Sequence, residues 1–122
     1  MIRLTLPYPP SDNHLYSVAN GRKVLSAAGR DYYKQVGQEC LVQLVGIPRH
    51  LRTCLAVAVD LHPPDRRRRD TANPTKALGD SLQKAGVMLD DAQIKEWHLY
   101  WCEPVRGGRV DVRIIELEYE TF

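Results

Sequence analysis

Cationic and acidic side chains are concentrated in one stretch of the chain, between Asp65 and Asp91. Four consecutive arginines lead to Asp70, Lys76 follows, and the stretch ends on Asp90 and Asp91. Arginine guanidinium groups neutralise phosphates, whereas carboxylates are suitable ligands for Mg²⁺ or Mn²⁺. A metal ion held by carboxylates can activate water and stabilise charge at a scissile phosphate. The residue types and their order therefore make a nuclease the first hypothesis.

This stretch lies in a chain of ordinary composition. With 122 residues, 43% of them hydrophobic and 26% charged, the chain is long enough for one globular domain, residues 1–122. The net charge is only +2, so attraction to nucleic acid must come from local clusters of cations. Such clusters are the run Arg66, Arg67, Arg68 and Arg69, and the pair Arg106 and Arg109.

The positions of cysteine and histidine argue against a disulfide framework or a zinc site. The three cysteines and four histidines lie far apart, without a C-x-x-C pair. No apolar run approaches the roughly 20 residues of a membrane span, and the N-terminal sequence lacks a signal-peptide pattern. We therefore expect a cytoplasmic protein with no membrane partner.

The first elements expected are two short strands joined by a polar loop. Alternating apolar and polar residues predict a strand over Ile2–Leu6, which prolines terminate. The loop is expected over residues 11–20 and carries Asn13, a candidate DNA contact. An ordinary connection between strands explains the same loop equally well. A second short strand is expected over residues 22–25.

A helix and a central strand follow. Ser26 is a good N-cap for a helix from about residue 27 to 45. Its buried face is expected to comprise Tyr33, Val36, Cys40 and Leu44. The strand is expected over residues 53–61, with Leu55, Val57, Val59 and Leu61 on one face and small residues on the other. Because both faces are apolar, this strand is predicted to lie in the interior of the sheet.

A second helix is expected from Asn73 to residue 85. Asn73 suits the cap, Pro74 suits the first turn, and Gly86 suits the C-terminal stop. Lys76 stands in the first turn, where a cation opposes the helix dipole, and this hints at a functional role. The spacing of Lys76, Asp80 and Lys84 also fits plain ion pairing on a solvated face, which is the interpretation favoured for Asp80 and Lys84.

The C-terminal third is expected to form an antiparallel strand pair over residues 97–102 and 109–119. A change in the alternation predicts a β-bulge between Ile114 and Ile115. Trp97 and Trp101 share one strand face and are expected in the core or in a dimer interface. The fold class is therefore α+β, with a mixed or antiparallel sheet of about four to five strands and two main helices.

Two motifs identify a family that the chain resembles. The N-terminal LPYPPSDNHLY is similar to an LPxPPSxNxxY opening. The longer motif is DRRRRD, followed by a spaced N, K and D, then L-x-x-A-G and DDAQ, over residues 65–93. Together these resemble the RusA family of Holliday junction resolvases, over nearly the whole chain.

The resemblance implies a small homodimeric endonuclease of bacteria and their phages. Such enzymes bind four-way DNA junctions and make paired nicks with Mg²⁺ or Mn²⁺. Three aspartates build the family's metal site, and they correspond to Asp70, position 72 and Asp91 here. The resemblance also assigns Lys76 to catalysis and places the motif asparagine at Asn73.

Position 72 departs from the family pattern, because it is alanine. A methyl group offers no oxygen to a metal, so we expect weakened metal binding and slow or absent cleavage. Asp90 is a candidate substitute ligand. An engineered knock-out and a natural loss of activity both fit, and one replacement in an otherwise intact motif favours the first.

Three functional hypotheses follow. The first is the junction-resolving nuclease, in which the arginine run contacts DNA backbone phosphates, although a solvated charge run explains the same residues. The second is a structure-selective junction-binding protein without catalysis. The third, a nucleotide-dependent enzyme acting on small substrates, is disfavoured because no phosphate-cradling glycine loop precedes a helix.

Overall fold

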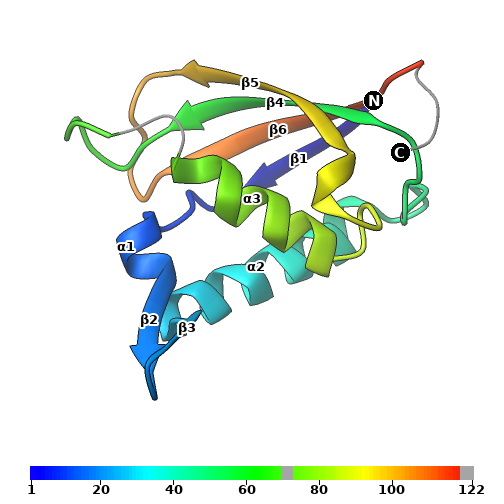
Figure 1. Ribbon diagram of the computed structural model, residues 1–122. Helices are drawn as coiled ribbons and strands as arrows, with labels where there is room; N and C mark the ends of the chain where they lie inside the picture. The colour runs from blue at the N-terminus through cyan, green and yellow to red at the C-terminus, as the bar shows by residue number, and fades with distance from the viewer. Residues whose placement is uncertain (70–72, 119–122) are drawn as a thin grey trace.

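A four-stranded mixed sheet with two helices on one face forms the body of the molecule (Figure 1). The computed structural model describes residues 1–69 and 73–118. In sheet order the strands are β1 (Ile2–Leu6), β6 (Arg109–Glu116), β4 (Leu55–His62) and β5 (Ile94–Trp101). The helices are α2 (Ala27–Gln43) and α3 (Asn73–Lys84). The predicted α+β class and the two main helices are thereby confirmed.

The central strand β4 agrees with the sequence prediction. Leu55, Val57, Val59 and Leu61 are fully buried, and Ala56 and Ala58 on the opposite face are buried too. The strand pairs with β5 in parallel and with β6 antiparallel, so both of its edges are hydrogen-bonded. A strand that is apolar on both faces gains most from this interior position.

The predicted pairing of the last two strands is wrong. β5 and β6 run antiparallel to each other but are not neighbours, because β4 lies between them. Helix α3 instead connects β4 to β5 as a parallel crossover, which needs a long connection of this kind. The β-bulge predicted at Ile114 and Ile115 is also wrong, since their register with β4 is continuous. The irregularity lies between Leu55 and Ala56, opposite β5.

The segment predicted as a polar loop contains regular structure. A short helix, α1 (Asp12–Leu15), leads into β2 (Tyr16–Ala19), which forms a separate hairpin with β3 (Arg22–Leu25). Asn20 and Gly21 form the turn with φ values of 52° and 74°. Both are residues that adopt positive φ readily, so the two-residue hairpin turn is favoured. The hairpin projects below the sheet (Figure 1).

Helix α2 begins as predicted but buries a different tyrosine. Ser26 Oγ accepts a hydrogen bond of 3.0 Å from the Gly29 amide and caps the helix. Tyr32, rather than the predicted Tyr33, joins Val36 and Cys40 on the buried face, because these three residues are spaced by four. Tyr33 is only partly buried and turns toward α3.

Helix α3 packs one mostly apolar face against the core. Ala77, Leu78, Ser81 and Leu82 are fully buried. Gly86, with φ of 78°, ends the helical segment in the left-handed conformation. Among the described residues, no helix is long and apolar enough to cross a membrane.

Candidate active site

Asp91 lies against the middle of α3. It begins a short 3₁₀ helix, η1 (Asp91–Gln93), which immediately precedes β5. A Cβ atom added at Gly79 would lie 3.5 Å from Asp91 Oδ2, an ordinary van der Waals contact, so the Asp91 carboxyl group packs directly on this part of α3. The pKa of Asp91 is raised, first because burial removes it from water and then because Asp80 and Asp90 lie close. The fold thus gathers negative charge at the α3–η1 contact.

Gln93 fixes the backbone that carries Asp91. This side chain is fully buried, and its Oε1 accepts hydrogen bonds of 2.9 Å from the amides of Leu89 and Asp90. Its Nε2 donates to the carbonyls of Leu51 at 2.8 Å and Thr53 at 2.9 Å. A buried amide with this many partners holds η1 rigidly against the segment that leads into β4. The sequence interpretation missed this role, although the DDAQ motif contains the residue.

Asp90 has a structural role in the same turn. Its Oδ1 accepts a hydrogen bond of 2.8 Å from the Ala92 amide and caps η1. The Gln93 side chain returns to the Asp90 backbone, so the pair forms a capping box. One oxygen of Asp90 is therefore already engaged in the fold.

Asp80 connects the lysine of the motif with Asp91. Lys76 Nζ lies 3.5 Å from Asp80 Oδ2, and Tyr33 Oη donates a hydrogen bond of 3.1 Å to the same oxygen. The pKa of Lys76 is raised, chiefly by the negative charge of Asp80. The pKa of Tyr33 is raised by burial and then by Asp80. The predicted pairing of Lys76 with Asp80 is present, but Asp80 is only 24% exposed and takes part in the site.

Lys84 does not join this group. Its Nζ lies 5.9 Å from the centre of the Tyr33 ring, a cation–π contact between α3 and α2. Tyr33 is a site neighbour that the sequence interpretation missed, since it lies 47 positions from Asp80. The K-x-x-x-D spacing of Lys76 and Asp80 was the only sequence signal for the larger cluster.

The remaining predicted metal positions cannot be placed. Asp70 and Ala72 lie outside the described residues, and the side chain of Asn73, the first residue of α3, does as well. Within residues 1–69 and 73–118, no three His, Cys, Asp or Glu side chains gather so that they could hold a metal ion. The described part of the site therefore consists of neighbouring aspartate carboxylates and one adjacent lysine.

The arginine run is folded around Asp65 rather than extended. Asp65 Oδ1 lies 2.8 Å from Arg69 Nη1 and accepts a hydrogen bond of 2.9 Å from the Arg67 amide. Arg69 Nη1 also donates to the carbonyls of Asp65 at 3.1 Å and Arg67 at 3.0 Å. The hydrogen bonds from Arg69, which has the largest effect, and from Arg67 lower the pKa of Asp65 to about 2. Arg69 is consequently held in place, with only 19% of its side chain exposed.

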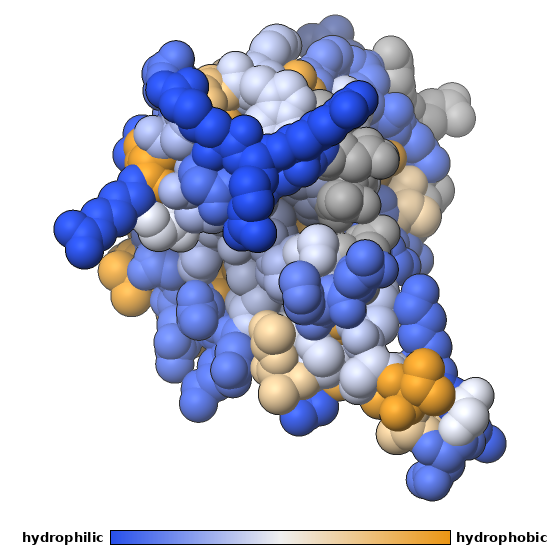
Figure 2. Space-filling view, turned by 90° about the vertical axis from the view of Figure 1, so that its left-hand side faces the viewer, coloured by the Kyte–Doolittle hydropathy of each residue, from blue (hydrophilic) through white to orange (hydrophobic). Residues whose placement is uncertain are grey.

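The other three arginines face solvent. Arg66 pairs at 3.2 Å with Glu103, Arg67 is 81% exposed, and Arg68 is exposed as well. Hydrophilic side chains dominate the end of the molecule that carries this loop (Figure 2). This exposure is compatible with phosphate contacts by Arg66, Arg67 and Arg68.

The glycine-rich segment with Arg106 and Arg109 is not a hairpin between neighbouring strands. It spans from β5 to β6 across the end of β4. Arg106 and Arg109 are exposed, and Arg109 lies 3.4 Å from Asp111. Asn13 is exposed on α1. Their sequence neighbours His14 and Gly107 line one cavity together with the arginine loop and Pro74 of the first turn of α3. Asp91, in η1, instead packs against the middle of α3 at Gly79.

Comparison with known proteins decides the family. Residues 7–115 match the family described as Endodeoxyribonuclease RusA. The chain belongs to the RusA family. It is 37% identical over 117 residues to the crossover junction endodeoxyribonuclease RusA of Escherichia coli strain K12, with 96% of each chain covered. It is 38% identical, with the same coverage, to the enzyme of that description from Enterobacteria phage 82.

A more divergent RusA relative gives the same result. The crossover junction endodeoxyribonuclease RusA of Escherichia coli O139:H28 is 34% identical over 114 residues, which cover 93% of each chain. The resemblance inferred from the motifs is thereby confirmed. Every candidate site residue lies inside the range that matches the RusA family, and the individual roles stay predictions.

Proposed function

We propose that this chain is a structure-specific endodeoxyribonuclease that nicks four-way DNA junctions. The observation that carries the proposal is the convergence of Lys76, Asp80 and Asp91 where α3 meets η1, beside the arginine loop, in a chain of the RusA family. Relatives in this family are named crossover junction endodeoxyribonucleases.

The donor set at this site suits a hard divalent cation. Mg²⁺ and Mn²⁺ take oxygen ligands, and Asp91 presents a carboxylate next to that of Asp80. We propose Asp70 and Asp91 as the ligands of the metal. When bound, such an ion lowers the pKa of a water and offsets charge on the scissile phosphate.

The residues of the chain supply the remaining functions. The Lys76 ammonium donates to a phosphate oxygen and stabilises the charge that grows there during cleavage. Asp80 pairs with this lysine and orients it, while Tyr33 donates a hydrogen bond that orients Asp80. Arg66, Arg67 and Arg68 contact backbone phosphates, which positions the junction without reading its sequence.

Alanine at position 72 limits this chemistry. Its methyl group provides neither an oxygen ligand nor a negative charge, so the metal is bound more weakly than with an aspartate there. We propose that the chain binds junctions normally but cuts them slowly. The carboxylates of Asp80 and Asp90 are the described groups nearest to Asp91 that could compensate in part.

A junction-cleavage assay tests the nuclease proposal. A labelled four-way junction is incubated with this chain, with Ala72→Asp, or with Ala72→Asn, in Mg²⁺ and in Mn²⁺. The asparagine variant is the matched control, since it adds the same shape without the charge. We expect fast paired nicks with Ala72→Asp, slow or absent cleavage by the other two proteins, and equal gel-shift affinity for all three. If Ala72→Asp does not cut in either metal, the nuclease proposal is wrong.

Ala72 also favours a second candidate function, which is junction binding without cleavage. That function predicts that binding weakens as salt rises, because cations of the protein neutralise DNA phosphates. It also predicts that neither metal nor the residue at position 72 changes the affinity. The same gel shifts, repeated over a range of salt concentrations, distinguish it from the nuclease. Cleavage by Ala72→Asp would show that the site is built for catalysis. Junction binding without cleavage would then describe only the chain with alanine at position 72.

Paired nicking requires two active sites related by a two-fold axis, so we propose a homodimer. Trp97 packs against the core, whereas Trp101 at the edge strand β5 is 46% exposed. Light scattering after size exclusion measures the mass directly, and we expect twice the 13.9 kDa of the chain. A monomer that persists with bound junction would contradict the dimer but not the chemistry of one site.

A further inference from the structure

A cavity of about 360 Å³ opens between the arginine loop and the segment that joins β1 to α1. Its size is at the lower end of the roughly 300–1,000 Å³ typical of small-molecule sites. Tyr8 and Pro9 line it on one side, and Pro64, Arg67 and Arg69 line it on another. Pro74, in the first turn of α3, completes the wall and places the cavity next to the helix that carries Lys76.

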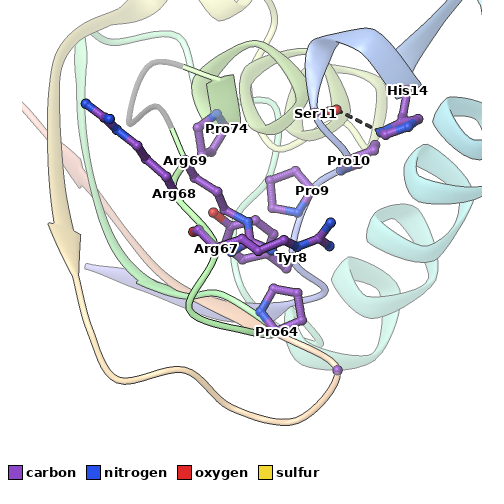
Figure 3. A pocket seen from close by; sticks show the side chains of 11 residues that line it. Tyr8, Pro9, Pro10, Ser11, His14, Pro64, Arg67, Arg68, Arg69 and Pro74 are labelled. Carbon is purple, nitrogen blue, oxygen red and sulfur yellow. Dashed lines mark hydrogen bonds between the residues drawn. The ribbon is translucent and has the colours of Figure 1, made fainter.

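The walls of the cavity offer flat surfaces for stacking. Arg69 Cζ lies 5.8 Å from the centre of the Tyr8 ring, and Asp65 holds this guanidinium in place. Figure 3 shows Arg67 lying across the cavity in front of Tyr8, between Pro9 and Pro64. The Arg67 side chain is 81% exposed and its Nε pairs with Asp65 at 3.2 Å, so its guanidinium is accessible to a planar group that enters the cavity. Aromatic rings and guanidinium planes of this kind stack on nucleobases.

Polar atoms stand at one end of the cavity. Ser11 Oγ and His14 Nδ1 lie 2.9 Å apart and both residues line the cavity (Figure 3). A hydroxyl and an imidazole can each donate or accept, so they suit the edge of a base. None of the described residues that line the cavity carries a carboxylate, whereas three are arginines. The lining therefore suits a planar group attached to an anion, which is the chemistry of a nucleotide.

We propose that this cavity receives one unstacked base from beside the branch point of the junction, with its flanking phosphates held by Arg67 and Arg68. This inference rests on the proposed function, because the base must come from bound junction DNA. In an open four-way junction the bases at the branch point lack one stacking neighbour, so extruding them costs less than extruding a base from continuous duplex. A base bound at the N-terminal end of α3 would fix which phosphate of the same DNA strand lies beside Lys76.

Fluorescence of 2-aminopurine tests the cavity. Junctions carry this base either next to the branch point or well inside one arm, and emission is followed at saturating protein without divalent metal. Unstacking raises the emission, so we expect an increase of at least about twofold at a branch-adjacent position and none inside the arm. Tyr8→Phe keeps a ring and should retain the increase, whereas Tyr8→Ala should lose most of it.

Two further variants separate stacking from simple charge or folding effects. Arg66→Ala removes an arginine outside the cavity, so it should weaken affinity but keep the increase at saturation. His14→Trp places a bulky side chain in the cavity from an exposed position. This variant provides the test of the cavity if Tyr8→Ala does not fold. It should abolish the increase.

The outcomes separate this inference from the proposed function. Saturated binding without increased emission at any branch-adjacent position would reject the cavity and leave the nuclease intact. An increase that persists in both Tyr8→Ala and His14→Trp would also reject it, because unstacking would then occur elsewhere. If the protein binds no junction at all, both the proposed function and this inference fail.

Discussion

The ammonium group of Lys76 lies 3.5 Å from the carboxylate of Asp80, one turn farther along α3. This pair joins the residue proposed to act on the phosphate to the carboxyl group of Asp91, because Asp80 also lies close to Asp91. Tyr33 reaches Asp80 from α2, so two helices fix one oxygen. The lysine side chain, although 56% exposed, therefore has an ion-pair partner on its own helix that links it to the site.

Removing the lysine should affect cleavage and leave binding intact. Lys76→Ala, made together with Ala72→Asp so that cutting is measurable, is expected to lower the single-turnover rate by about 100-fold to 1,000-fold, as for loss of one transition-state donor. Gel-shift affinity should change little, since other cations hold the junction. Equal losses of rate and affinity would instead make Lys76 a binding residue.

Removing the charge of Asp80 should have a smaller effect of the same kind. Asp80→Asn, again with Ala72→Asp, leaves Lys76 without its main electrostatic partner, and we expect a rate about tenfold lower. Asp80→Glu should recover part of the loss. Tyr33→Phe removes one hydrogen bond but keeps the charge, and serves as the matched control. If Asp80→Asn and Tyr33→Phe slow cleavage equally, the charge of Asp80 is not what matters.

Asp91 should make the protein less stable as it ionises. Its folded pKa is raised above the ordinary 3.8, so the carboxyl group favours folding below that value and loses this contribution as pH rises through the folded pKa. Asp91→Asn should therefore raise the melting temperature by a few degrees at pH 7, with no difference near pH 3. Asp90→Ala also removes a charge but loses the cap of η1, so it should lower the melting temperature.

Metal provides a second test at the same residue. A ligand that binds only the folded state raises its melting temperature. We expect millimolar Mg²⁺ to stabilise the Ala72→Asp protein more than this chain, and not to stabilise the Asp91→Asn variant. Melting curves with EDTA supply the baseline. A metal effect that survives in Asp91→Asn would place the ion elsewhere.

The fold was predictable where local pattern decides it. Two apolar faces identify β4 as an interior strand, and Asn73, Pro74 and Gly86 delimit α3. Strand order was not predictable in this way. Neighbouring strands in sequence usually pair, but β5 and β6 are separated by β4, and only the crossover through α3 reveals it.

The candidate site shows the same difference between residues that a local motif identifies and residues whose roles depend on packing. Asp91 and Lys76 could be named as candidates from the sequence because they belong to a motif with fixed spacing. Asp80, Tyr33 and Gln93 were missed because their roles depend on how α2, α3 and η1 pack together. The arginine run was interpreted as phosphate contacts or as a solvated charge run, and neither interpretation predicts that Asp65 folds it back and buries most of Arg69. A cavity lined from three separate segments leaves no sequence signal at all.

Two glycines of α2 should respond oppositely to the same substitution. At Gly29 an added Cβ would lie 2.6 Å from the Leu15 carbonyl oxygen and 2.8 Å from Leu25 Cδ1, so the helix could not keep its contact with the hairpin. Gly29→Ala should therefore destabilise the protein by about 1–3 kcal/mol. At Gly37 an added Cβ meets nothing within 4 Å, and Gly37→Ala should stabilise the helix by about 0.5–1 kcal/mol. Urea unfolding of both variants measures the difference, and a tolerated alanine at Gly29 would show that α2 does not approach the hairpin this closely.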